Sequence, residues 1–197
     1  QQDFYSEINR KEMYIRYLNK LYDLHMECDN YTEAAYTIEL HAKLLNWSDD
    51  DLHKILKSNR HAHAQTHRQL KEALYYNIIE NYDKGRLWEC AIEKCQELAT
   101  QFQSETFDYE QLSQLYRRMA KFYEDIMKKS RAIPEYFRVG YFGKGFPQFL
   151  QNKMFIYRGK EYERLADFNA RILNEFPKAE LLNKLTPPGE DITESDR

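Results

Sequence analysis

The sequence is poor in residues that break helices and in cysteine. Its 197 residues include 6 glycines, 5 prolines and 3 cysteines, and five of the glycines fall between Pro134 and Asp191. The cysteines are odd in number and lie within helical patterns, which argues against a disulfide framework and indicates a cytoplasmic location.

Long hydrophobic runs and an excess of positive charge are also absent. No apolar run approaches the ~20 residues of a membrane-spanning helix, and the first residues, QQDFYSEINRKEMY, contain no signal-peptide core. The formal net charge is -3, so we expect no nucleic-acid partner. What remains is a globular composition with 31% charged residues, 42% hydrophobic residues and many aromatic ones, 16 Tyr and 11 Phe.

Helical periodicity runs through the first 130 residues. Apolar residues recur every three or four positions, which predicts helices over about 12–28, 32–45, 66–83, 88–102 and 109–129. We expect Thr32 to cap the second helix, Asp49–Asp51 to cap a short helix through Leu56, and Gly85 to end the third helix in the left-handed conformation. The predicted buried faces are Ile15, Leu18, Leu21, Tyr22 and Leu24; Ala34, Ala35, Ile38, Ala42 and Leu45; Leu70, Leu74, Tyr75, Ile78, Ile79 and Tyr82; and Leu112, Leu115, Tyr116, Met119, Phe122, Tyr123 and Ile126.

An internal repeat connects two of these helices. The segment Asn30–Ala35 aligns with Arg86–Ala91 at an offset of 56 residues, and both segments open a helix with Glu, a small residue and Ala. Small residues there allow neighbouring helices to approach closely, so we expect Trp88, Ala91 and the matching Ala35 to be buried. The sequence therefore predicts a mainly α fold, an antiparallel helical-hairpin array of tetratricopeptide-like type.

The periodicity changes at Pro134, which predicts the start of a β-containing lobe. Aromatic and β-branched residues at Tyr136–Phe142 and Phe155–Gly159 indicate two strands, and Glu161–Phe176 indicates a helix with Leu165, Phe168, Ile172, Leu173 and Phe176 on one face. We expect three regions: a helical lobe over 1–130, the beginning of a β-rich lobe over 131–185, and a flexible tail over 186–197.

The reactive and metal-binding residue types of the sequence do not form a catalytic pattern. His61, His63 and His67 suggest a metal cluster, but the set lacks a Cys or a suitably spaced acidic ligand, and a solvated loop explains them better. Cys90 and Cys95 are five positions apart, which suits packing rather than a redox pair. No nucleophilic triad or cysteine–histidine arrangement is present. We therefore expect no bond-making chemistry, no cofactor and no metal.

Two further patterns have ordinary explanations. The glycines of Gly140-x-x-Gly143-x-Gly145 match neither common phosphate-binding order, so an aromatic β-turn explains them better. Glu161 with Glu163, and Glu190 with Asp191, are paired carboxylates without a second functional group nearby, which is typical of solvated charge.

Several longer segments resemble one known family. They are AAYTIELHAKLL (Ala34–Leu45), DKGRLWECAI (Asp83–Ile92), PEYFRVGYFGKGFP (Pro134–Pro147), NKMFIYRGKEYER (Asn152–Arg164) and TPPGED (Thr186–Asp191). These segments resemble the Dock (dedicator of cytokinesis) family, in the exchange-factor domain called Dock homology region two. The resemblance covers two blocks, about 12–50 and 83–191, and is weakest in the connector around 51–68.

The resemblance implies a function in small-GTPase signalling. In the family, a helical first lobe supports the domain and dimerises, a second lobe of β-sheets contacts the GTPase, and a third lobe inserts a loop that expels nucleotide. It implies that this chain is the first lobe and the start of the second, without the catalytic third lobe. A purified chain is then expected to give no nucleotide exchange by itself.

The implied partners follow from the same resemblance. They are a Rac-type GTPase of the complete domain and a second copy of the chain, with signalling to the actin cytoskeleton and recruitment to the plasma membrane through other parts of the parent. The residues implied to face the GTPase are Tyr136, Phe137, Tyr141, Phe142, Phe155 and Tyr157. The alternative is a tetratricopeptide-like scaffold that binds a peptide, and the sequence that follows Arg197 in the parent reading frame would separate the two.

Overall fold

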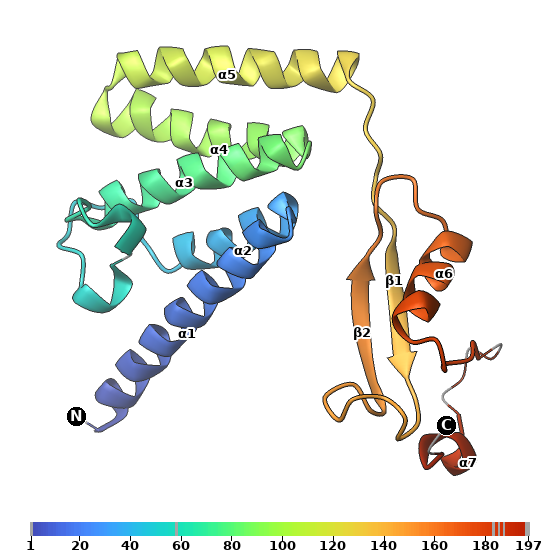
Figure 1. Cartoon of the computed structure of the whole chain (residues 1–197). Helices are drawn as coiled ribbons and strands as arrows, with labels where there is room; N and C mark the ends of the chain where they lie inside the picture. Colours follow the sequence, from blue (N-terminus) through green and yellow to red (C-terminus); the bar gives the residue numbers. More distant parts are fainter. Residues whose placement is uncertain (1, 58, 183, 185, 187, 196–197) are drawn as a thin grey trace. The chain divides into compact units, whose positions relative to one another are not determined.

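The chain divides into two compact units, Gln1–Ser130 and Arg131–Arg197. The computed structural model describes residues 2–57, 59–182, 184, 186 and 188–195 (Figure 1). None of the helices in these described ranges is long and apolar enough to cross a membrane.

The first unit consists of five long helices that follow one another in chain order. They are α1 (Gln2–Glu27), α2 (Tyr31–Ala42), α3 (His67–Lys84), α4 (Trp88–Gln101) and α5 (Tyr109–Lys128). Each helix packs against the next one along the chain, as Figure 1 shows. This arrangement confirms the predicted mainly α fold.

Short elements complete the first unit. Two 3-10 turns, Lys54–Leu56 and Asn59–His61, lie in the connector between α2 and α3, and a π-helical turn, Phe102–Thr106, follows α4.

Polar caps explain two of the helix starts. The Gln69 N–H donates to Thr66 Oγ1 at 3.3 Å before α3, and the Gln111 N–H donates to Asp108 Oδ1 at 3.0 Å before α5.

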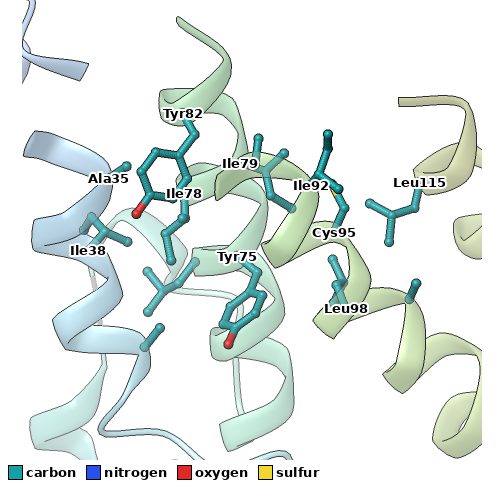
Figure 2. Close-up of a cluster of buried hydrophobic side chains, with 14 of the residues drawn as sticks. Ala35, Ile38, Tyr75, Ile78, Ile79, Tyr82, Ile92, Cys95, Leu98 and Leu115 are labelled. Atoms are coloured by element: carbon teal, nitrogen blue, oxygen red, sulfur yellow. The ribbon is translucent and has the colours of Figure 1, made fainter. Parts of the chain in front are cut away.

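The predicted helical core is largely confirmed. Figure 2 shows Ala35 and Ile38 of α2 near Tyr75, Ile78, Ile79 and Tyr82 of α3, with Ile92, Cys95 and Leu98 of α4 and Leu115 of α5 on the other side. Trp88 and Ala91 are buried as expected. Leu24, Tyr116 and Tyr123 are exceptions, because they are 48–49% exposed on the outer faces of the first and last helices.

The internal repeat is present, but its offset is 57 residues rather than 56. The Asn30 N–H donates to His25 O and the Leu87 N–H to Tyr82 O, both at 2.8 Å. One position earlier, Asp29 and Arg86 have φ of 56° and 57°. The counterpart of Ala91 is therefore Ala34 and not Ala35, although all three alanines are 0% exposed.

Three expectations about helix ends are wrong. Asn30 rather than Thr32 precedes α2, and Thr32 lies within that helix. His53 caps the first 3-10 turn, since Asp51 pairs with Thr66 across the connector instead. Helix α1 also starts well before residue 12, because residues 2–11 contain no helix breaker.

Gly85 ends α3 for a different reason from the one predicted. Its φ is -76°, so the left-handed residue is Arg86. A Cβ at Gly85 would lie 2.4 Å from Thr32 Oγ1 and 3.1 Å from the Thr32 nitrogen. The glycine is needed because α2 begins directly against the end of α3.

The second unit begins with an antiparallel hairpin of β1 (Tyr136–Tyr141) and β2 (Lys153–Arg158). The register pairs Tyr136 with Arg158 and Tyr141 with Lys153. The expected change from helix to strand is thus confirmed. Helix α6 (Leu165–Glu175) starts later than predicted, because Tyr162 has a φ of 61° that a helix cannot contain.

Helix α7 (Glu190–Thr193) lies in the tail, where the sequence pattern indicated no element. It returns to the β1–β2 turn: the Lys144 N–H donates to Ser195 O at 2.7 Å, and the Lys144 ammonium pairs with Glu194. Pro187, Asp196 and Arg197 of this tail lie outside the described residues.

We predict that Gly85→Ala lowers the free energy of unfolding by about 1–3 kcal/mol, because the added methyl group overpacks the contact with α2. Thermal and urea denaturation of the full chain measure this. Thr32→Ala in the same chain removes the nearest atom and should restore part of the loss. Equal stability of Gly85→Ala and the parent chain would contradict the contact.

Candidate functional site

The β1–β2 hairpin has two faces of different character, because side chains alternate along a strand. Phe137, Val139 and Tyr141 of β1 share one face with their cross-strand partners Tyr157, Phe155 and Lys153. The other face carries Tyr136, Arg138 and Gly140 of β1 and Arg158, Ile156 and Met154 of β2. The six aromatic residues implied by the family resemblance are thus divided between opposite faces.

Helix α6 covers the first of these faces. The Phe168 ring of α6 stacks on Phe137 with centroids 4.2 Å apart, and Phe176 lies 5.5 Å from Tyr141. Phe137 and Tyr141 are 8% and 2% exposed. Four of the six implied residues, Phe137, Tyr141, Phe155 and Tyr157, therefore form the aromatic core of the second unit.

Two tyrosine hydroxyl groups within this core form a hydrogen bond with each other. The Tyr141 and Tyr157 oxygens are 2.7 Å apart. Burial, followed by this hydrogen bond, raises the pKa of Tyr141 above its ordinary value. The phenol therefore stays neutral and serves packing rather than acid–base chemistry.

The second face of the hairpin is open to solvent. Ile156 is 74% exposed, Tyr136 55% and Met154 46%. Phe142 belongs to this face, since a Cβ on Gly140 would lie 2.6 Å from its ring. We call Tyr136, Arg138, Gly140, Phe142, Met154, Ile156 and Arg158 the open face.

The open face combines an apolar centre with two guanidinium groups. Isoleucine, methionine and tyrosine provide apolar contact area, and Arg138 and Arg158 can bind carboxylates. This chemistry suits the surface of another protein. Of the six implied residues only Tyr136 and Phe142 lie here, and the strict alternation of a strand would have indicated Arg138, Met154, Ile156 and Arg158 as well.

Other candidate groups are occupied by contacts within the protein. The Gly143 N–H donates to Asn152 Oδ1 at 3.2 Å. This N–H therefore stabilises the connection between β1 and β2 rather than binding a phosphate. His67 Nδ1 accepts from the Asn46 N–H at 3.3 Å. Burial raises the pKa of the Cys95 thiol to about 12. Within the described ranges, no three His, Cys, Asp or Glu residues converge to hold a metal ion.

A second exposed surface lies along α5. Tyr109, Tyr116 and Tyr123 recur every seven residues and are 63%, 48% and 49% exposed, and Met127 is 75% exposed. The exposed small residues Ser113 and Ala120 alternate with them on the same side of the helix. We call Tyr109, Ser113, Tyr116, Ala120, Tyr123 and Met127 the α5 stripe.

The turn between β2 and α6 is built around the Glu163 carboxylate. This group accepts hydrogen bonds from the Lys160 N–H at 2.8 Å and from Arg171 Nε and Nη2 at 2.8 and 2.9 Å. The Glu163 N–H donates in turn to Lys160 O at 3.1 Å. Glu163 is therefore a structural anion rather than one member of an acid–base pair with Glu161.

The Glu163 carboxylate is predicted to titrate far below an ordinary glutamate. Hydrogen bonds from Arg171 and from the Lys160 N–H lower its pKa from 4.5 to about 2. Because the folded-state pKa is depressed, the stabilisation is complete above about pH 4.5 and is lost as the pH falls toward 2. Carbon-13 NMR titration of the glutamate carboxyls measures the midpoint.

The matched variant Arg171→Gln should raise this midpoint toward 4.5, and Arg117→Gln, on α5 of the first unit, should leave it unchanged. A Glu163 midpoint near 4.5 in the parent chain would show that the ion pair does not form in solution.

Comparison with known proteins assigns the chain to a family. A family model described as DHR-2, Lobe A matches residues 2–128. Human dedicator of cytokinesis protein 4 is 46% identical over 195 residues and human dedicator of cytokinesis protein 3 is 45% identical over 195, each over 98% of this chain. The DOCK-like protein 1 of Saccharomyces cerevisiae is 25% identical over 174 residues, or 88% of this chain.

The matches cover almost all of this chain but only a small part of each relative. The chain spans only 10% of the length of dedicator of cytokinesis protein 4 and 9% of the length of the other two relatives. The lobe A match and the identity across almost the whole chain nevertheless agree with each other: this chain belongs to the Dock family and carries its DHR-2 lobe A over residues 2–128.

Proposed function

We propose that the chain is part of a guanine nucleotide exchange factor for Rac- or Rho-family small GTPases. The observation that carries the proposal is the lobe A match over residues 2–128, together with 46% identity to a dedicator of cytokinesis protein. The helical unit supplies support and dimerisation, and the unit from Arg131 supplies part of the GTPase-facing surface. An unrelated peptide-binding scaffold has no comparable support, because the helical unit itself matches lobe A.

The proposed contact with the GTPase is the open face. Its apolar centre, Tyr136, Met154 and Ile156, provides burial, and Arg138 and Arg158 favour a partner surface that carries carboxylates. This revises the six residues implied by the resemblance, since Phe137 and Tyr141 are buried under α6. In the complete domain, exchange depends on tighter binding of the nucleotide-free GTPase than of the nucleotide-bound form, and no bond is made or broken.

The biological setting follows from the same proposal. A Rac-directed exchange factor acts in signalling to the actin cytoskeleton, in the cytoplasm, and reaches the plasma membrane through other parts of a longer protein. No cofactor is needed by the residues of the open face, whose side chains bind by apolar contact and hydrogen bonding.

We predict that Ile156→Asp weakens the binding of nucleotide-free Rac by about tenfold or more, because it puts a charge into the apolar centre of the contact. Chemical-shift changes in the nitrogen-15-labelled full chain measure affinities even in the millimolar range. Met13→Asp, at a residue that is 70% exposed on α1, is the matched control and should bind like the parent. Equal affinity of both variants would remove the open face from the proposal.

The proposed homodimer uses the α5 stripe. Tyrosines that alternate with serine and alanine provide knobs and holes for a second helix, and the seven-residue spacing is that of a helix–helix seam. Helix α5 is also the last helix of the unit, and its inner side packs against α4. Its outer side carries the exposed α5 stripe, and we propose that a second copy binds there.

We predict that Tyr116→Asp raises the dimer dissociation constant by about tenfold or more, because a charge at the centre of the seam loses its solvation on association. Sedimentation velocity over a range of chain concentrations measures the change. Tyr17→Asp, at a residue 62% exposed on α1, is the control. A parent chain that sediments as a monomer at every concentration would refute the α5 dimer.

A further inference from the structure

Two adjoining cavities lie along one side of α3. Their volumes are about 320 and about 370 Å³, and Ala73 and Tyr76 line both. The lining follows α3 from Gln69 to Lys84, which is about 22 Å at the rise of a helix and gives room for about six residues of an extended peptide. We call the two cavities the α3 groove, whose opposite side is formed by Tyr22 and Met26 of α1 and by His61 and His63 of the connector.

The Glu72 carboxylate in this groove has no partner. Glu72 lines the second cavity and is partly buried. Among the residues that the structure describes, none forms a hydrogen bond or an ion pair with this carboxylate. Burial, followed by the nearby Asp108 carboxylate, raises the pKa of Glu72. An anion that is partly buried beside a like charge costs stability, which is typical of a residue retained for binding.

The cations near the groove do not compensate this charge, because they have partners of their own. Lys84 pairs with Glu80, Arg60 with Asp23 and Arg68 with Asp49, and Arg118 lies over the Phe122 ring. Glu72 and Asp108 offer too few ligands for a metal ion such as Ca²⁺. An ammonium or guanidinium group fits better, since it can pair with a carboxylate and also lie on the face of the Tyr76 ring.

Asn77 provides a hydrogen-bond donor in the first cavity. Its Oδ1 accepts from the Tyr22 hydroxyl at 3.0 Å and from Asn81 Nδ2 at 2.7 Å. The Asn77 NH₂ group finds no acceptor in the described part of the chain. His61 Nε2 is likewise buried without a partner there. An extended peptide carries a carbonyl acceptor at every residue, so it can satisfy such donors.

We propose that the α3 groove binds a peptide segment of a partner protein, with a lysine or arginine side chain against Glu72 and Tyr76 and a backbone carbonyl bonded by Asn77. The charge of the groove and its length along α3 select this occupant. The groove uses no residue of the open face or of the α5 stripe. It therefore adds a second partner to the proposed exchange factor and does not replace the GTPase.

Selection of short random peptides displayed on phage tests the recognition, with the full chain as the target. The parent chain should enrich peptides that share a lysine or arginine at one position, and the Glu72→Gln chain should not. A synthetic peptide of the enriched sequence should bind Glu72→Gln about tenfold more weakly in fluorescence anisotropy, because a charge-assisted hydrogen bond is lost. Glu93→Gln removes the same charge from an exposed position on α4 and should bind like the parent.

Two measurements separate recognition from packing. The midpoint of thermal unfolding should be unchanged or higher in Glu72→Gln, because a neutral amide is less costly to bury than a carboxylate. In the full chain labelled with carbon-13 at the alanine methyl groups, the synthetic peptide should shift the Ala73 signal. The signal of Ala120, which is exposed on α5, should stay in place.

Several outcomes would overturn the groove. They are a selection that enriches no peptide, enriched peptides without a shared cationic residue, and equal affinity of the synthetic peptide for the parent and Glu72→Gln. A shift of the Ala73 signal with chain concentration, in the absence of peptide, would assign the groove to a second copy instead. Glu72→Gln should bind nucleotide-free Rac like the parent, so the failure of this inference leaves the proposed function intact.

Discussion

Close approach between helix backbones is the constraint on which the first unit depends. Ala34, Ala35 and Ala91 are each 0% exposed where α2 and α4 meet their neighbours. Gly85 lets α2 begin against the end of α3. Large side chains such as Tyr82 and Trp88 then fill the remaining space at the density of a protein interior. A longer side chain at any of these small positions separates two helices along their length.

The tyrosines of this core need partners for their hydroxyl groups. The Tyr82 hydroxyl donates to Glu39, and the Tyr75 hydroxyl donates to Glu97 at 2.6 Å. Lys94 lies between the two carboxylates, 2.7 Å from Glu97 and 3.9 Å from Glu39. Burial and the neighbouring carboxylates raise the pKa of both tyrosines, so they remain donors. The network joins α2, α3 and α4 through polar contacts that accompany the apolar ones.

The type and order of the main elements were predictable because periodicity is a local property of the sequence. The buried face of α3 follows the predicted pattern from Leu70 to Tyr82. The buried faces of the outer helices were predicted less well. Tyr116, for example, falls on the apolar periodicity of α5, but no neighbouring helix covers it. Coverage is a tertiary property, and the periodicity of one helix does not reveal it.

The candidate site shows the same limit more sharply. Family resemblance indicated the β1–β2 hairpin, but it named aromatic residues from both faces of the hairpin, including those packed under α6. The alternation of side chains would have separated Phe137 from Tyr136, whereas the identity of the covered face depends on Phe168, which is 31 residues away along the chain. The requirement for glycine at position 85 was equally invisible, because it comes from Thr32 on another helix.

Both tryptophans belong to the first unit, and this has a spectroscopic consequence. Trp88 is 1% exposed and donates to Asp83 Oδ1 at 3.0 Å, and the Trp47 ring lies 5.0 Å from that of Tyr75. The second unit contains tyrosine and phenylalanine but no tryptophan. Intrinsic fluorescence excited at the red edge of the absorption band therefore reports on the helical unit alone. The near-ultraviolet circular dichroism of the tyrosines, in contrast, includes Tyr136, Tyr141 and Tyr157 of the hairpin.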